Sequence, residues 1–392
     1  MKGKLRRGLA DLACRLLQPI LPRSLRSWGW AIRCETASIP DATQALLFAL
    51  GSLCALAPRV VAAHLFHPSA SPVGNGGLHI GGSIAMNIYN SAMKHPRVLG
   101  IACAVGAVAL GLVYLTIAGA PARYLAVNAG ALAVGLATLF LLDRISAGWH
   151  QWAGASIAVM AAALLATALL GREADGAARW VNLAGFAIQP SLVLLPVMLL
   201  AFSRTRDATA TAGIVVAAAA MALQPDRAMA GMLVLGTGVL AAMRLDRHIL
   251  AALAASVAGF VATLARADIL PATPYVDQIL YTSFDVHAAA GAAVLGGSAL
   301  LLVPAIIGWS RDPAHRATYA TFGLVWLAAV MAAALGNYPT PVVGYGGSAV
   351  LGYVLSLLAL PTVAGDRAGA AIPPARSAGG APDNHHPIVG IA

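Results

Sequence analysis

Charge is what this sequence has least of. Only 10% of its 392 residues are charged, whereas charged residues make up about a quarter of a typical soluble domain. Hydrophobic residues account for 59%, and the mean hydropathy is +0.78. This composition excludes a soluble enzyme, a coiled coil and a disordered chain, because so large an apolar excess is stable only where lipid covers most of it. We therefore expect an integral membrane protein.

Cysteine and glutamate are also scarce. The four cysteines have no metal-ligand spacing, so we expect free thiols and no metal site or disulfide scaffold. Glutamate occurs only at Glu35 and Glu173, so a carboxylate with a chemical role must come mainly from aspartate.

Ten apolar runs follow residue 96, most of them near the 20 residues that a helix needs to cross a bilayer core of roughly 30 Å. The loops between them are too short for a soluble domain. The sequence thus predicts an all-α fold, a polytopic helical membrane protein with about ten transmembrane helices. The runs are 97–118, 121–141, 152–171, 183–203, 208–223, 226–243, 247–266, 286–307, 317–336 and 342–363.

Basic residues are concentrated at the start of the chain, where eight of the 25 lysines and arginines lie in the first 41 positions. A basic segment beside a bilayer favours cytoplasmic placement next to anionic lipid, and we interpret residues 1–42 in this way, with no nucleic-acid partner. Most arginines between the later runs fall in alternate loops, which indicates that the carboxy terminus is inside and that the loops at 172–180 and 267–285 are outside.

The stretch 43–65 is apolar but is interrupted by Pro58, Arg59 and His64. We expect residues 43–92 to form an interfacial segment and a glycine-rich linker. The alternative is that 43–65 spans the membrane. The transmembrane domain is then 93–363, and residues 364–392, rich in Ala, Gly and Pro, are expected to be a disordered tail.

Three polar stretches occur at helix ends. They are GAARWVNLAGFAIQPS at 176–191, QPD at 224–226 and PTPVVGYGGS at 339–348. Each stretch alone has a structural explanation. The first contains an interfacial tryptophan and a proline at a helix entry, the second an aspartate that can cap a helix, and the third glycines that allow close helix packing. Because polar groups near lipid need a shared polar environment, we expect them to converge on one outward-facing cavity. The residues concerned are Trp180, Gln189, Ser191, Asp226, Tyr345, Gly346, Gly347 and Ser348.

Together, in this order and spacing, the three stretches resemble the SEDS family of shape, elongation, division and sporulation proteins, of the RodA and FtsW type. The resemblance covers about 93–363. It implies a bacterial cytoplasmic-membrane protein of cell-wall synthesis, cell division or cell shape, and specifically a glycosyltransferase that polymerises the lipid-linked disaccharide lipid II beside a class B transpeptidase. The eight residues above and Arg179 would then bind the lipid-linked sugar.

The sequence departs from the family pattern after Gln189-Pro190-Ser191. The family has glutamate and, three residues on, lysine, where this chain has Leu192 and Leu195. The outer loop before the eighth run is also short. These departures favour an alternative, a catalytically degenerate relative that serves as a lipid-binding or scaffold partner of cell-wall enzymes. A flippase or transporter ranks third, because the apolar runs contain almost no charged residues.

Polymerisation requires a base for the acceptor hydroxyl and a cation, from an arginine or a divalent metal ion, for the departing diphosphate. An ungapped match to the family places Asp285 as the base, at the start of a helix whose dipole would keep it ionised, with Asp277 as the fallback. A simple N-cap is the structural alternative for Asp285. Among the outer arginines, only Arg179 lies in a motif; His287 is interpreted as an orienting or bystander side chain, not a metal ligand.

Overall fold

The computed structural model describes residues 95–145, 149–174, 177–183, 185–266 and 271–362, together with 26–42 and isolated positions between 7 and 52. The first of these is α2 (Arg26–Ser38). The stretch 43–65, the linker after it and the tail from 364 lie largely or wholly outside the described residues, so the expectations for them stay predictions.

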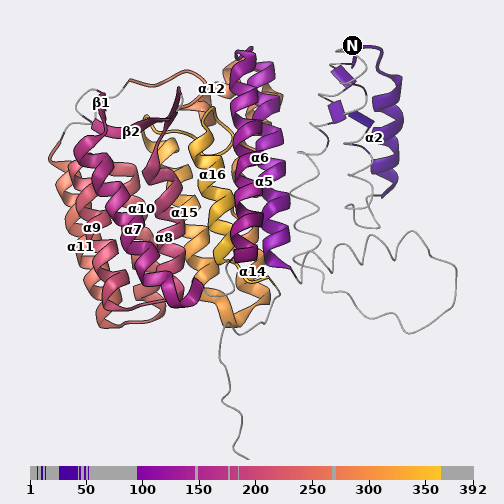
Figure 1. The fold of residues 1–392 in the computed structure, drawn as a ribbon. Helices are drawn as coiled ribbons and strands as arrows, with labels where there is room; N and C mark the ends of the chain where they lie inside the picture. Colours follow the sequence, from indigo (N-terminus) through magenta and orange to yellow (C-terminus); the bar gives the residue numbers. More distant parts are fainter. Residues whose placement is uncertain are drawn as a thin grey trace, which may run out of the picture.

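The helices from α5 onward run side by side and form one bundle, as Figure 1 shows. Neighbouring helices pack in the pairs α5 with α13, α6 with α16, α7 with α9, α9 with α11, α10 with α15, and α8 with α16. Their bounds are α5 (Pro96–Ile117), α6 (Ala122–Ile145), α7 (Trp149–Leu170), α8 (Pro190–Arg204), α9 (Ala208–Leu223), α10 (Arg227–Met243), α11 (Arg247–Leu264), α12 (Ile279–Val286), α13 (Ala288–Leu300), α14 (Val303–Arg311), α15 (Arg316–Leu335) and α16 (Gly347–Ser356).

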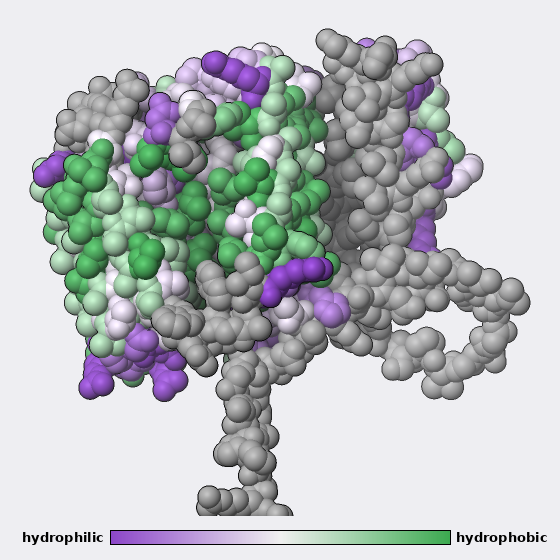
Figure 2. All heavy atoms as spheres, in the orientation of Figure 1, coloured by the Kyte–Doolittle hydropathy of each residue, from purple (hydrophilic) through white to green (hydrophobic). Residues whose placement is uncertain are grey.

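Within the described part of the chain, six helical segments are long and apolar enough to cross a membrane, and four shorter apolar helices accompany them. Figure 2 shows the hydrophobic surface of the helices as a broad band, with hydrophilic residues gathered toward the two ends of the bundle. The predicted fold class is confirmed: the protein is a multi-pass helical membrane protein.

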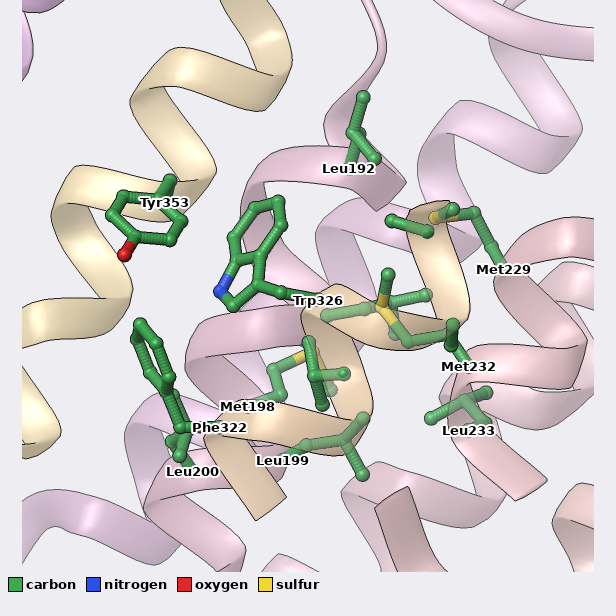
Figure 3. Close-up of a cluster of buried hydrophobic side chains, with 14 of the residues drawn as sticks. Leu192, Met198, Leu199, Leu200, Met229, Met232, Leu233, Phe322, Trp326 and Tyr353 are labelled. Carbon is green, nitrogen blue, oxygen red and sulfur yellow. The ribbon is translucent and has the colours of Figure 1, made fainter. Parts of the chain in front are cut away.

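The core holds large side chains from several helices, shown in Figure 3. Trp326 and Phe322 of α15 pack edge-on against Tyr353 of α16, with ring centroids 5.0 and 5.4 Å apart. Methionines of α8 and α10 fill the space beside them, and an unbranched thioether fits such irregular gaps well. This packing holds α8, α10, α15 and α16 together beneath the end of the bundle that carries the polar stretches.

Three predicted runs differ clearly from the observed helices: two helices begin later than expected, and one run is divided. The helix expected at 183 begins at Pro190, because a short antiparallel sheet precedes it: β1 (Arg172–Ala174), β2 (Ala177–Leu183) and β3 (Phe186–Ile188). The glycine at 185, with φ of +86°, makes the turn between β2 and β3. The helix expected at 342 begins at Gly347, because residues 337–346 form an irregular loop.

The run expected at 286–307 is divided into α13 and α14. Pro304 has no N–H to continue the helical ladder, which explains the break at Leu301 and Leu302. The hydroxyl of Tyr353 donates to the carbonyl oxygen of Leu301 (3.2 Å), so a backbone group freed by the break keeps a partner within the bundle.

The end opposite the sheet is held by arginines. Arg97 of α5 contacts Asp143 of α6 and donates to the carbonyl oxygens of Leu358 and Leu360 (both 3.0 Å), just after α16. Arg204 at the end of α8 donates to the carbonyl oxygen of Ala359 (3.1 Å). These contacts fix the other end of α16, whose first turn lies in the candidate site.

Candidate functional site

A cavity of about 910 Å³ opens at the sheet end of the bundle. Residues from four parts of the chain line it: α6, the sheet with the start of α8, the loop before α12, and the loop that leads into α16. They are Arg123, Ala126, Val127, Gly130, Ala131, Val134, Arg179, Trp180, Phe186, Ala187, Ile188, Gln189, Leu192, Pro271, Thr273, Val276, Asp277, Asn337, Tyr338, Pro339, Thr340, Tyr345, Gly346, Gly347, Ser348, Ala349 and Leu351.

The wall that α6 contributes carries a cation, Arg123, at the mouth of the cavity and is apolar further along the helix. Its lining residues recur three or four positions apart from Arg123 to Val134, which places them on one face of the helix. At 1.5 Å per residue this face extends about 16 Å along the helix. Apart from Arg123 it carries only alanine, valine and glycine, and Leu192 and Leu351 continue the apolar surface. The cavity can therefore hold an amphipathic molecule, with its polar part at the mouth and an apolar chain along α6.

The three polar stretches meet at this cavity. The backbone N–H of Gln189, the N-cap of α8, donates to Ser348 Oγ in the first turn of α16 (3.0 Å). Gln189 Nε2 donates to Asp226 Oδ2 at the start of α10 (2.9 Å), and Ser191 Oγ donates to the same oxygen (3.3 Å). Gln189 and Ser348 line the cavity, whereas Ser191 and Asp226 are buried behind the wall.

Asp226 is fully buried and caps α10 by accepting from the backbone N–H of Met229 (3.2 Å). Burial raises the pKa of its carboxyl above the usual range, while the charge of Arg179 and the hydrogen bonds from Met229, Gln189 and Ser191 act in the opposite direction. The carboxylate accepts from the start of α8, through Gln189 and Ser191, and from its own helix, through Met229. It organises the wall and is not among the residues that line the cavity.

Arg179 lies in β2, is 4% exposed and lines the cavity. Its guanidinium donates to the carbonyl oxygens of Gln224 (3.5 Å) and Pro225, which ties the sheet to the turn before α10. Gln224 in turn donates from Nε2 to the carbonyl oxygen of Leu164 (2.9 Å). Arg179 thus places positive charge beside the cavity while also holding the second polar stretch.

The third stretch is held by α6. Asn128 Nδ2 donates to the carbonyl oxygen of Gly344 (2.8 Å), and Asn128 Oδ1 accepts from the backbone N–H of Gly346 (3.1 Å). Tyr345, between these two glycines, stacks on Tyr124 with ring centroids 3.7 Å apart and planes 11° apart. The guanidinium carbon of Arg123 lies over the Tyr124 ring, 5.2 Å from the ring centre.

Among the described residues that line the cavity, Asp277 is the one carboxylate. It accepts from the backbone N–H of Thr273 (2.8 Å) and is 9% exposed. Its segment pairs with the loop before α16: Asp277 forms a β-bridge with Pro339, and the N–H of Thr340 donates to the carbonyl oxygen of Val276 (3.0 Å). Burial raises the pKa of the Asp277 carboxyl, and the hydrogen bonds from Thr273 oppose this effect.

These two paired loops contain unusual backbone conformations. Tyr275, Gln278 and Val342 have φ of +65°, +57° and +68°, in the left-handed region that residues with a Cβ rarely adopt. Val342 is the most costly of these, because it is β-branched. The surrounding hydrogen bonds hold the loops in this arrangement, which is common where a site is preorganised.

Asp285 does not lie where the sequence placed it. It is exposed in the last turn of α12, at the carbonyl end of that helix, and is not among the residues lining the cavity. The expectation that it begins a helix is wrong, because α12 and α13 are separate and His287 is the N-cap of α13, accepting from the backbone N–H of Ala289 (3.0 Å).

The donor set at the cavity does not suit a protein-bound divalent cation. Its described lining offers one carboxylate, Asp277, beside two arginines, and the described residues contain no group of three or more His, Cys, Asp or Glu side chains that could hold a metal ion. The positive charge at the mouth comes from Arg123 and Arg179.

Sequence reasoning missed Asn128, Tyr124 and Thr340. Asn128 carried a signal, because an amide within an apolar run must find hydrogen-bond partners in the bundle. Tyr124, in the first turn of α6, carried no signal, because its stacking on Tyr345 depends on a loop more than 200 positions away. Thr340 lies within the third polar stretch, but its pairing with Val276 depends on another distant loop.

No protein-family model matches the sequence, and no curated protein matches it. Solved structures do match. The crystal structure of the rod shape determining protein RodA of Thermus thermophilus is 22% identical and superposes with a TM-score of 0.50, over 66% of this chain and 93% of that chain. The chain has the fold of RodA.

A second RodA structure from Thermus thermophilus, in which an aspartate is replaced by alanine, matches at 22% identity with a TM-score of 0.49, over 66% of this chain and 94% of that chain. The RodA fold accounts for the arrangement of the helices around the cavity, while the chemistry of the cavity rests on the residues of this chain.

Proposed function

We propose that this protein is a SEDS-like integral membrane protein of bacterial cell-wall synthesis, placed in the cytoplasmic membrane, and that its cavity binds a lipid-linked sugar. The observation that carries the proposal is the meeting of the three polar stretches around one cavity with a cationic, polar mouth and an apolar wall along α6. A prenyl chain suits the apolar wall, a diphosphate suits Arg123 and Arg179, and a sugar suits the polar loops.

The reaction we propose is polymerisation of lipid II. A hydroxyl of the acceptor sugar attacks the anomeric carbon of the donor, a C–O bond forms, and the bond to the diphosphate breaks. A carboxylate takes the hydroxyl proton, and the arginines stabilise the charge on the departing diphosphate. Active-site preorganisation by the paired loops lowers the cost of aligning the two sugars.

Asp277 is the base in this proposal, and Asp285 becomes the second candidate. The sequence ranked them in the opposite order. Asp277 is supported by its place on the cavity lining and by its raised pKa, which makes the carboxylate a stronger proton acceptor. Asp285 is exposed on α12.

One observation favours the alternative of a lipid-binding or scaffold protein without activity. Leu192 and Leu195, which replace the family's glutamate and lysine, are both buried, and Leu192 lines the cavity. An apolar surface there retains a lipid groove but removes two charged groups. A class B transpeptidase is the partner that either function implies.

The test is polymerisation of purified lipid II by the protein in liposomes, alone and with a class B transpeptidase. Glycan chains longer than the starting disaccharide support the polymerase. Binding of lipid II without any chain growth, under both conditions, would favour the scaffold function, and the absence of binding would contradict both.

A further inference from the structure

Asn128 is a buried amide in the second turn of a membrane helix, and both of its polar ends are used on one short segment of another part of the chain. It is fully buried. Its Nδ2 and Oδ1 bond to the backbone of Gly344 and Gly346, more than 200 positions away in sequence, and so bracket Tyr345 from both sides. An amide placed for helix packing alone would not need two partners two residues apart.

The segment that Asn128 holds would not keep its shape unaided. Gly346 has φ of +150°, which is accessible essentially to glycine, and Val342 lies in the left-handed region. The backbone N–H of Tyr345 donates to the carbonyl oxygen of Tyr275 (2.7 Å), so the loop is held from the α12 side as well. Conformational freedom at Tyr345 is therefore removed on both sides.

The Tyr345 side chain is held by the same helix. Tyr124 lies one turn before Asn128 on α6, and its ring covers one face of the Tyr345 ring. Tyr275 packs edge-on against Tyr124, with centroids 5.9 Å apart. Tyr345 lines the cavity, directly before the glycines that begin α16.

We propose that Asn128 is a positioning residue, which together with Tyr124 fixes Tyr345 as a rigid wall that the polar head of the ligand contacts. The inference rests on the proposed function, because it takes the ligand to be a lipid-linked sugar. It assigns to α6 a second task beside lining the apolar groove: the helix also shapes the polar mouth.

The test measures binding of lipid II to the purified full-length protein in detergent, with thermal stability recorded for each variant. Asn128→Leu should weaken lipid II binding by roughly 10-fold, because both backbone hydrogen bonds are lost and Tyr345 is released. Tyr345→Leu should weaken it to a similar extent. In the Tyr345→Leu background, Asn128→Leu should have an effect of less than about 2-fold, since residues that act as one unit are not additive.

Two further variants separate positioning from folding. Ser356→Ala is the control, because Ser356 is also a buried polar side chain with two hydrogen bonds, from Trp326 Nε1 (3.3 Å) and to the carbonyl oxygen of Tyr353 (2.6 Å), but does not line the cavity. It should lower thermal stability and leave lipid II affinity unchanged. If Asn128→Leu does not fold, Tyr124→Leu takes its place, since it removes the stacking and keeps the Asn128 hydrogen bonds, and it should also be non-additive with Tyr345→Leu.

The outcomes are distinct. Wild-type affinity in Asn128→Leu, or effects of Asn128→Leu and Tyr345→Leu that multiply in the double variant, would overturn the positioning role and leave the proposed function standing. A wild-type protein that does not bind lipid II would overturn the proposed function and, with it, this role for Asn128.

Discussion

Gln189 and Asp226 are joined by a hydrogen bond of 2.9 Å from Gln189 Nε2 to Asp226 Oδ2, although 37 positions separate them in the sequence. The bond connects the N-terminus of α8 to that of α10, and the backbone of Gln189 connects both to Ser348 in α16. Three helix starts are thus fixed to one another behind the cavity, and the predictions below test what this arrangement does.

Asp226→Asn should destabilise the protein by about 1–3 kcal/mol. The carboxylate accepts three hydrogen bonds, from Gln189, Ser191 and Met229, and an amide would turn an N–H group toward one of these donors. The measurement is thermal unfolding in detergent. Ser191→Ala, which removes a single donor, should cost less, and equal losses in the two variants would count against the shared-acceptor description.

The same carboxyl predicts a pH dependence. Burial raises its native pKa above the value near 3.9 of an unfolded aspartate, so between these values the native state holds a proton that the unfolded state has lost. The contribution of Asp226 to stability should therefore fall as pH rises through this window. Compared with Asp226→Asn, the wild type should lose relative melting temperature across the window and then level off; a gain would contradict the sign.

Thr340→Val should leave the melting temperature unchanged or raise it. Thr340 is 3% exposed, and its hydroxyl has no hydrogen-bond partner among the described residues, so replacing it with a methyl group of the same shape removes an unsatisfied polar group. Thr321→Val is the control, because the Thr321 hydroxyl donates to the carbonyl oxygen of Ala317 (2.8 Å). A larger loss in Thr340→Val than in Thr321→Val would show that Thr340 has a partner.

Reporter fusions at about residues 175 and 380 should lie on opposite sides of the membrane. Seven spans separate the two positions when the α13–α14 pair counts as one crossing. The other six spans are α8, α9, α10, α11, α15 and α16. The distribution of arginines places the first position outside. Reporters on the same side would contradict this topology.

The sequence was sufficient for the bundle because helix spans in lipid follow from apolar length alone. The run expected at 208–223 coincides with α9, and the two runs that follow it, 226–243 and 247–266, lie within two residues of α10 and α11. The exceptions are informative. The hairpin before Pro190, the loop before Gly347 and the break at Leu301 depend on backbone pairing and on partners such as Tyr353, which an apolar count does not register.

The candidate site was predictable where motifs carried it and unpredictable where distant loops meet. Seven of the nine residues expected to bind the ligand line the cavity, and the other two, Ser191 and Asp226, support its wall. The order of Asp285 and Asp277 came from an ungapped match, which could not register that α12 and α13 are separate helices. Asn128 holds its loop through contacts more than 200 positions away, beyond the reach of local spacing.

The most direct measurement of the central claim compares lipid II polymerisation by the wild type, Asp277→Asn and Asp285→Asn in liposomes containing a class B transpeptidase. Loss of a positioned base typically costs about 10²- to 10⁴-fold in rate, so Asp277→Asn should be nearly inactive while Asp285→Asn keeps most of the activity. Burial raises the pKa of Asp277. As the pH is lowered, the rate of the wild type should therefore begin to fall at a pH above the range in which an ordinary aspartate titrates. Full activity in Asp277→Asn would contradict the assignment of this cavity as the active site.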